Sequence, residues 1–222
     1  MKTLITCFKN DRALYPNNPH REIIQKLEQQ NVLNGEVSYI SLIPTFSFCR
    51  DWLNRLDFSL YDNFILCGGT HRPSNIYLEL YARNQYENKD LNEILQISQG
   101  GENILKTTID LKSIISSMSD SKHINISTNA GTHICNYLFY RCLEVTRNSN
   151  KKVIFIHVSS DYEDWKLNAI KEIISLITIN KIAKKRKTED IIDEMVKWNV
   201  PEDKDEMPID NVIGDVPMHW HY

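Results

Sequence analysis

The sequence predicts a single α/β domain in which a mostly parallel, twisted sheet is covered by helices on both faces. Short β-rich apolar runs alternate with segments of helical periodicity through most of the 222 residues. The length, with 41% hydrophobic and 25% charged residues, suits one sizeable core. Because parallel strands need helix-sized connections, the alternation favours a mostly parallel sheet.

Five segments have the composition of central strands, because they are short, apolar and bounded by polar, glycine or proline residues. They span residues 3–8, 36–43, 63–67, 124–127 and 153–158. Apolar residues recur with helical spacing in residues 19–30, 48–57, 110–118, 135–145 and 164–187. The last helical segment carries one stripe that is expected to be buried, made of Leu167, Ile170, Ile173, Ile174 and Ile177.

The C-terminal part of the chain differs in composition from the rest. The α/β domain is expected to span residues 1–198 and to end in a short helix at 188–198. Residues 199–222 form an acidic, proline-bearing tail that is expected to be irregular. Two histidines in this tail do not complete a metal site, so no metal ligands are predicted.

The charge distribution excludes several classes of partner. The net charge of -3 comes from 26 basic and 29 acidic residues mixed along the chain, which indicates neither a nucleic-acid nor a membrane surface. The apolar run near the N-terminus is too short for a signal peptide, and no stretch approaches the roughly 18 apolar residues of a membrane span. Five cysteines without C-x-x-C pairing favour a reducing, cytoplasmic location.

The most informative stretch is HINISTNAGTHICNYLFY, where a strand ends in a small polar turn and a helix begins at or just before Cys135. The unpaired N–H groups of a first helical turn favour a thiolate over a thiol, so the pKa of Cys135 is expected to be lowered. The same groups can stabilise an oxyanion. The alternative is that Cys135 is a small apolar residue at a helix start.

Two further residues complete a set suited to acyl transfer. His157 lies in the apolar run VIFIHVSSD and is expected to emerge near the carboxyl end of its strand, where it can act as a base. Glu79 follows the GGTHRP turn and can orient the imidazole by accepting its second ring N–H. A core histidine and a surface glutamate are the alternatives, and spacing alone does not show that these residues meet.

Three separated motifs resemble those of the pyroglutamyl peptidase I family, whose members remove N-terminal pyroglutamate by cysteine catalysis. S-T-N-A-G-T-H-I-C-N at 127–136 is similar to the nucleophile motif, and FIHVS at 155–159 is similar to F-I-H-V-P. GGTHRPSNIYLELYARN at 68–84 resembles a G-G-R turn followed by E-R-x-A-I-N. The resemblance spans roughly residues 3–180 and implies that Cys135, His157 and Glu79 are catalytic.

The resemblance also implies residues that contact the substrate. They are Phe8, Thr45, His133, Ile134 and Lys89, the last in place of an arginine. The segment after the first strand departs from the family pattern T-G-F-x-P-F-G-G, because only Phe8 remains of its aromatic residues and both final glycines are absent. His133 also stands where an aromatic residue is usual.

The implied reaction is attack by Cys135 on the carbonyl of an N-terminal pyroglutamyl residue, followed by hydrolysis of the acyl-enzyme. The substrate is then a peptide with a blocked N-terminus, no metal or organic cofactor is required, and the family resemblance implies a homodimer or homotetramer. Two alternatives remain. One is a thiol-dependent amidase or peptidase of altered N-terminal specificity, and the other is a non-catalytic binding protein on the same fold.

Overall fold

The computed structural model describes residues 1–9, 19–30, 33, 35–72, 75–88, 91–159 and 163–178. They belong to one compact unit that spans Met1–Ile182. The end of the helix predicted at 164–187, the helix predicted at 188–198 and the tail predicted at 199–222 lie outside the described residues.

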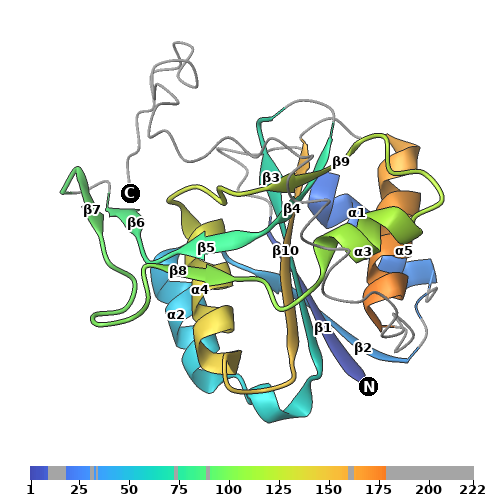
Figure 1. The fold of residues 1–222 in the computed structure, drawn as a ribbon. Coiled ribbons are helices and arrows are strands. Elements are labelled where there is room, and N and C mark those ends of the chain that lie inside the picture. The colour runs from blue at the N-terminus through green and yellow to red at the C-terminus, as the bar shows by residue number, and fades with distance from the viewer. Residues whose placement is uncertain are drawn as a thin grey trace, which may run out of the picture. The chain divides into compact units, whose positions relative to one another are not determined.

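A six-stranded sheet forms the centre of this unit (Figure 1), with the strand order β2-β1-β3-β10-β4-β9. The strands are β1 (Lys2–Phe8), β2 (Glu36–Leu42), β3 (Asn63–Thr70), β4 (Ile76–Glu79), β9 (Ile124–Ser127) and β10 (Lys152–Ser159). All five predicted strands are present, and β1, β2, β3 and β10 run parallel to one another. The predicted α/β class is confirmed.

Strand β4 was not predicted, and it makes the sheet mixed. It runs antiparallel to β10, and β9 runs parallel to β4. The connection from Thr70 to Ile76 is too short to hold a crossover helix, and a parallel return would need one. The chain therefore reverses direction here, which places Glu79 in the sheet next to the strand that carries His157.

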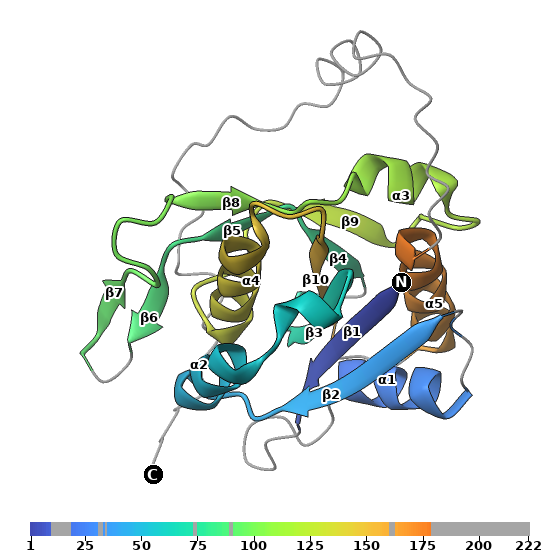
Figure 2. The ribbon, with the colours of Figure 1, turned by 90° about the horizontal axis from the view of Figure 1, so that it is seen from below.

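Helices cover the sheet from two sides, as Figures 1 and 2 show. One side carries α1 (Pro19–Gln30), α3 (Leu111–Ser117) and α5 (Asp164–Thr178), and the other carries α2 (Phe46–Arg55) and α4 (Ile134–Thr146). We call these the α1 face and the α4 face. Strand alternation divides the core between them, because Ile154 and Ile156 pack on the α1 face while Phe155 packs on the α4 face.

The stripe predicted on α5 is confirmed for four of its five residues. Ile170, Ile173, Ile174 and Ile177 are completely buried, whereas Leu167 is partly buried and packs against the same cluster. Removing such side chains from water stabilises the fold by roughly 1.5–3 kcal/mol each.

An excursion between β4 and α3 forms two small antiparallel pairs. β5 (Tyr81–Arg83) pairs with β8 (Ile104–Lys106), and β6 (Tyr86–Asn88) pairs with β7 (Glu93–Leu95). The side chain of Asn136 in α4 accepts a hydrogen bond from the backbone N–H of Arg83 at 2.9 Å and donates to the carbonyls of Arg83 and Gln85 at 2.9 and 2.8 Å. The excursion is therefore anchored next to Cys135.

Candidate active site

Helix α4 begins one residue before Cys135. Its N-cap residue, His133, makes no capping hydrogen bond with its side chain, so the N–H groups of the first turn are not capped by it. The preceding turn requires Gly131, whose φ of +80° is unfavourable for other residues, and the Asn129 Oδ1 accepts from its N–H at 2.9 Å. The local sequence thus places the thiol at a helix start, as predicted.

The sulfur of Cys135 lies directly over strand β3. A Cβ atom on Gly68 would lie 3.0 Å from the Cys135 Sγ and 2.9 Å from the Phe155 Cζ, so only glycine leaves room for the thiol. Gly68 is the register partner of His157 in the neighbouring parallel strand. The Phe155 and His157 rings, both on the α4 face, have centroids 4.7 Å apart. The structure therefore brings the Cys135 thiol and the His157 imidazole together on one face of the sheet.

Glu79 contacts the imidazole of His157 directly. The His157 Nδ1 and the Glu79 Oε1 are 2.7 Å apart, and both side chains are buried. When Nδ1 donates its hydrogen to the carboxylate, Nε2 keeps a lone pair that can accept the proton of a thiol. Because both partners are buried, water competes far less for this contact than it does for a surface ion pair.

The ionisation of Cys135 differs from the prediction. Burial, together with the negative charge of Glu79, raises the pKa of the Cys135 thiol to about 12. The expectation that the helix start lowers this pKa is wrong, because desolvation outweighs the attraction of the first-turn N–H groups. Cys49, whose buried thiol donates to the carbonyl of Ile43, has its pKa raised to about 12 by burial as well. Cys135 differs from Cys49 in that the His157 imidazole lies on the same face of the sheet beside it.

Phe8 and Thr45 occupy different environments. Phe8 is buried at the end of β1 on the α4 face, and the β1–β3 register, continued by two residues, places it beside Gly68. It therefore lies at the same level of the sheet as the sulfur. Thr45 is the exposed N-cap of α2, and its Oγ1 accepts from the backbone N–H of Phe48 at 3.3 Å. Its contact with a substrate stays a prediction.

Two of the remaining predicted substrate contacts, His133 and Ile134, directly precede Cys135 in the sequence, and the third lies outside the residues that the structure describes. The His133 Nδ1 lies 3.4 Å from the Glu87 Oε2, in a partly exposed pair at the start of α4. Ile134 is partly buried and packs against the core of the α4 face. Lys89 lies outside the described residues. Substrate contacts at these three positions remain predictions.

Arg72 is a residue of the site that the sequence interpretation did not single out. Its Nη2 donates to the Glu79 Oε1 at 3.0 Å, and its Nη1 donates to the Ser127 Oγ at 3.0 Å. Its place in the GGTHRP turn, which was matched to a G-G-R turn, was the one available signal. The partner of an arginine in a turn cannot be read from spacing, because the partner is set by how the strands pair.

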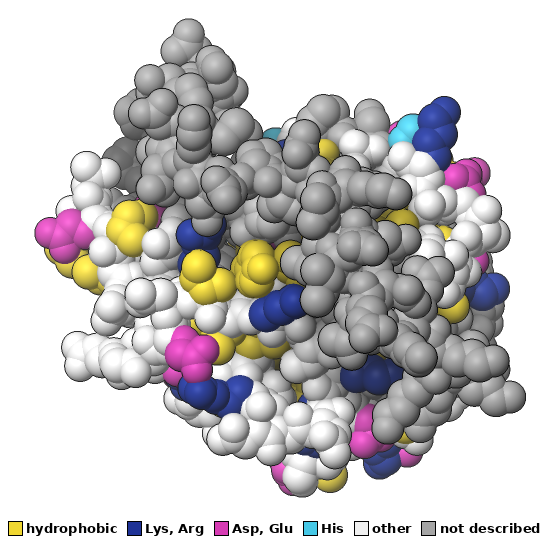
Figure 3. Space-filling model, in the orientation of Figure 1, with side chains coloured by type: hydrophobic (Ala, Val, Ile, Leu, Met, Phe, Trp, Pro, Cys, Tyr) yellow, Lys and Arg dark blue, Asp and Glu magenta, His cyan; other side chains and the backbone are white. Residues whose placement is uncertain are grey.

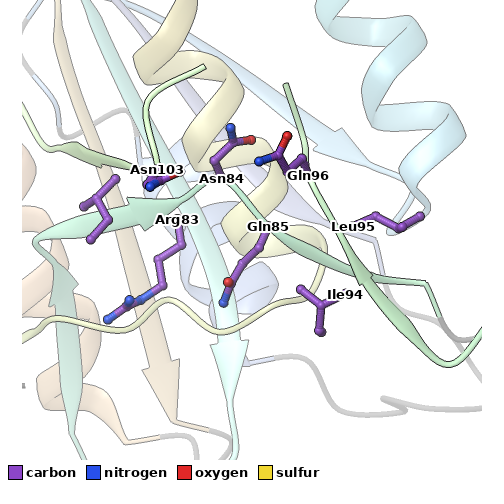
Figure 4. Close-up of a pocket in the computed structure, with 8 residues that line it drawn as sticks. Arg83, Asn84, Gln85, Ile94, Leu95, Gln96 and Asn103 are labelled. Atoms are coloured by element: carbon purple, nitrogen blue, oxygen red, sulfur yellow. The ribbon is translucent and has the colours of Figure 1, made fainter. Parts of the chain in front are cut away.

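A separate pocket of about 410 Å³ opens in the excursion between β4 and α3 (Figure 4). It is lined by Arg83, Asn84, Gln85, Ile94, Leu95, Gln96, Asn103 and Ile104. None of these residues belongs to the predicted catalytic set.

No helix among the described residues has the length and apolar character required to span a membrane. The part of the chain that the structure describes also contains no group of three His, Cys, Asp or Glu side chains placed to hold a metal ion.

A thiol, an imidazole and a buried carboxylate on one face of a helix-covered sheet constitute the arrangement of an α/β cysteine hydrolase. The chain belongs to the pyroglutamyl peptidase family, whose sequence profile matches residues 1–162. This membership makes the chain a cysteine hydrolase of the pyroglutamyl peptidase type. It favours this type over the altered-specificity and non-catalytic alternatives.

Solved structures show the same fold. The pyrrolidone carboxyl peptidase of Thermococcus litoralis has a TM-score of 0.69 and 20% identity, with 84% of this chain and 98% of that chain covered. The pyrrolidone carboxyl peptidase of Pyrococcus furiosus has a TM-score of 0.67 and 22% identity, with 79% and 97% covered. No curated protein sequence shows a significant match to the chain.

Proposed function

We propose that this chain removes the N-terminal pyroglutamyl residue from peptides, with Cys135 as nucleophile, His157 as general base and acid, and Glu79 as the orienting carboxylate. The observation that carries the proposal is the 2.7 Å contact between Glu79 and His157 on the sheet face over which the Cys135 sulfur lies. Family membership supports the choice of pyroglutamyl peptides as substrates.

Acylation begins when the Cys135 Sγ attacks the pyroglutamyl carbonyl carbon while its proton passes to the His157 Nε2. The resulting oxyanion accepts hydrogen bonds from first-turn N–H groups of α4. The imidazolium then protonates the amide nitrogen, the C–N bond breaks, and the shortened peptide leaves. The raised pKa of the thiol supports a proton transfer that accompanies attack, in place of a resting thiolate.

Deacylation uses the same imidazole, again first as a base and then as an acid. The His157 Nε2 takes a proton from water as the water oxygen attacks the thioester carbonyl. Breakdown of the second tetrahedral intermediate releases pyroglutamate, and the proton returns to the Cys135 Sγ. Glu79 stabilises the imidazolium in both halves of the cycle through Nδ1.

A fluorogenic pyroglutamyl amide, assayed under reducing conditions, tests this function. The wild-type protein is expected to release the fluorophore, and Cys135→Ser is expected to lose turnover because a hydroxyl ionises far less readily than a thiol. Cys142→Ser is the matched control, since Cys142 is a fully buried thiol on the same helix. Full activity in Cys135→Ser, or equal loss in both variants, would contradict the nucleophile assignment.

We also propose that the chain assembles into a homodimer or homotetramer. Leu91, Ile94 and Ile104 in the excursion are 59%, 57% and 42% exposed, which is high for large apolar side chains. Figure 3 shows hydrophobic side chains exposed on this face of the molecule over the excursion. Light scattering on the purified chain measures the assembly, and a monomer at all concentrations tested would overturn this proposal.

A cytoplasmic location is proposed as well. All five cysteines are free, and four of them are buried, which is typical of proteins in a reducing compartment. Cell fractionation is the measurement, and the chain is expected in the cytoplasmic fraction. Recovery with secreted or membrane fractions would contradict it.

A further inference from the structure

We propose that Arg72 is a positioning residue for the reaction, one that fixes the Glu79 carboxylate and ties it to the loop that carries Cys135. This inference rests on the proposed roles of Cys135, His157 and Glu79. Arg72 lies within the motif at 68–84, but the resemblance gives it no role, so its role is inferred from its contacts.

The guanidinium of Arg72 bridges two segments that are distant in the sequence. Its Nη2 donates to the Glu79 Oε1 at 3.0 Å and to the backbone carbonyl of Asn129 at 3.3 Å. Its Nη1 donates to the Ser127 Oγ at 3.0 Å. Ser127 ends β9 and begins the segment that leads to Cys135. One planar group therefore connects the carboxylate with the approach to the nucleophile.

Arg72 is itself held in place from two directions. Its backbone N–H donates to the Thr70 Oγ1 at 3.3 Å, and its guanidinium carbon lies 4.3 Å from the centroid of the Tyr77 ring. Tyr77 is the register partner of His157 in the antiparallel β4–β10 pair. The arginine thus stacks on the residue directly beside the imidazole, which distinguishes it from a freely rotating surface side chain.

The charges in the site explain why a cation is needed at this position. Glu79 is completely buried, and its Oε2 has no hydrogen-bond partner among the described residues. Its Oε1 contacts both the His157 Nδ1 and the Arg72 Nη2. While the imidazole is neutral, Arg72 is the positive group that offsets the buried carboxylate. It also weakens the unfavourable effect of the Glu79 charge on ionisation of Cys135.

A purely structural role predicts a different outcome from a positioning role. A brace between β3, β4 and β9 would lower the melting temperature without changing how Cys135 ionises. A positioning cation changes how readily the Cys135 thiol ionises, and it changes the rate of the chemical step. It leaves substrate binding nearly unchanged, because Arg72 acts through Glu79.

The test compares Arg72→Gln and Arg72→Lys with the wild type. For each protein, kcat and KM are measured with the fluorogenic pyroglutamyl amide, and the rate of Cys135 alkylation is measured at pH 8. Arg72→Gln is expected to lower kcat by about tenfold or more with little change in KM. It is expected to slow alkylation at pH 8 by about tenfold, because loss of a nearby cation lowers the thiolate fraction. Arg72→Lys keeps the charge and is expected to keep the alkylation rate while losing part of kcat.

The control is Arg147→Gln, which removes an arginine that pairs with Glu102 at 2.5 Å outside the site. It is expected to leave kcat and the alkylation rate unchanged. An Arg72→Gln protein with the wild-type alkylation rate would overturn the inference, whether or not its melting temperature is lowered. If the wild type leaves the amide intact, the proposed function fails, and the alkylation rates still decide the role of Arg72.

Discussion

Two buried histidines lie near opposite faces of the sheet, and within the described part of the chain only one of them has a hydrogen-bond partner. His157, on the α4 face, contacts Glu79 at 2.7 Å. His20 lies in the first turn of α1, on the helical side that carries Ile23, Ile24 and Leu27. It is only 3% exposed, and among the described residues neither of its ring nitrogens has a hydrogen-bond partner.

The contrast between these histidines shows that burial does not by itself make a catalytic base. Burial, followed by the charge of His157, lowers the pKa of His20 to about 3, so this imidazole is neutral across the physiological range. His157 has a buried carboxylate that stabilises its protonated form, and a thiol beside it. The partner, and not the degree of burial, equips an imidazole to take up and return a proton.

The largest expected effect separates the two histidines directly. His157→Ala is expected to lower kcat with the pyroglutamyl amide by about 10³-fold or more, because it removes the imidazole that accepts the thiol proton. His20→Ala is expected to keep a rate close to that of the wild type. Steady-state kinetics on both variants provide the measurement, and equal losses would remove the distinction drawn between them.

Glu79→Gln makes the surroundings of His157 more like those of His20, since it removes the negative charge and keeps the shape. Turnover is expected to fall by about 10- to 100-fold, less than in His157→Ala, because the imidazole remains but its protonated form loses a stabilising charge. The pH profile of kcat is the measurement. A Glu79→Gln protein with wild-type kcat at every pH would show that the carboxylate does not act through His157.

Gly68→Ala tests the close approach of the thiol to the sheet on the α4 face. The added Cβ would lie 3.0 Å from the Cys135 Sγ, so the sulfur must shift, and kcat is expected to fall by about tenfold. The free energy of unfolding is expected to fall by about 1–3 kcal/mol from overpacking. A Cys135→Ala background removes one of the two clashes, so the same glycine substitution is expected to cost less there. Equal costs in both backgrounds would contradict the placement of the sulfur.

The last expected effect concerns the unpartnered histidine and appears in stability instead of turnover. The pKa of His20 is about 3 in the folded state against 6.5 in the unfolded chain, so the unfolded state binds a proton first as the pH falls. Between about pH 6.5 and 3, this group is expected to lower the free energy of unfolding by about 1.4 kcal/mol per pH unit. Denaturant unfolding across this range measures the slope.

His20→Leu is expected to remove that contribution to the slope. At pH 7–8 the imidazole is neutral in both states, so the variant is expected to be at least as stable as the wild type, because an unpaired buried polar group is replaced by an apolar one. The comparison at pH 7–8 is the control for packing. An unchanged acid slope in His20→Leu would mean that His20 is not the buried neutral group described above.

Local patterns were sufficient to predict much of the fold, and the family resemblance was needed to select the three candidate catalytic residues. The runs at 3–8, 63–67 and 153–158 became β1, β3 and β10, because a parallel strand buried on both faces is nearly continuous in apolar residues. Cys135 could be selected because a helix start after a glycine turn is a local signal. The strand β4 was not predicted, because its four residues form a strand by pairing with β10 and β9, which come from distant parts of the chain.

The sequence by itself determined which residues could perform acyl transfer and that they belong to an α/β sheet. Only the tertiary structure decided that Glu79 reaches His157, that Cys135 lies over Gly68, and that Arg72 joins the site. It also reversed the expected pKa shift of Cys135. The physical reason is that pairing across strands and desolvation depend on which segments pack together, whereas helical and strand periodicity depend on near neighbours in the chain.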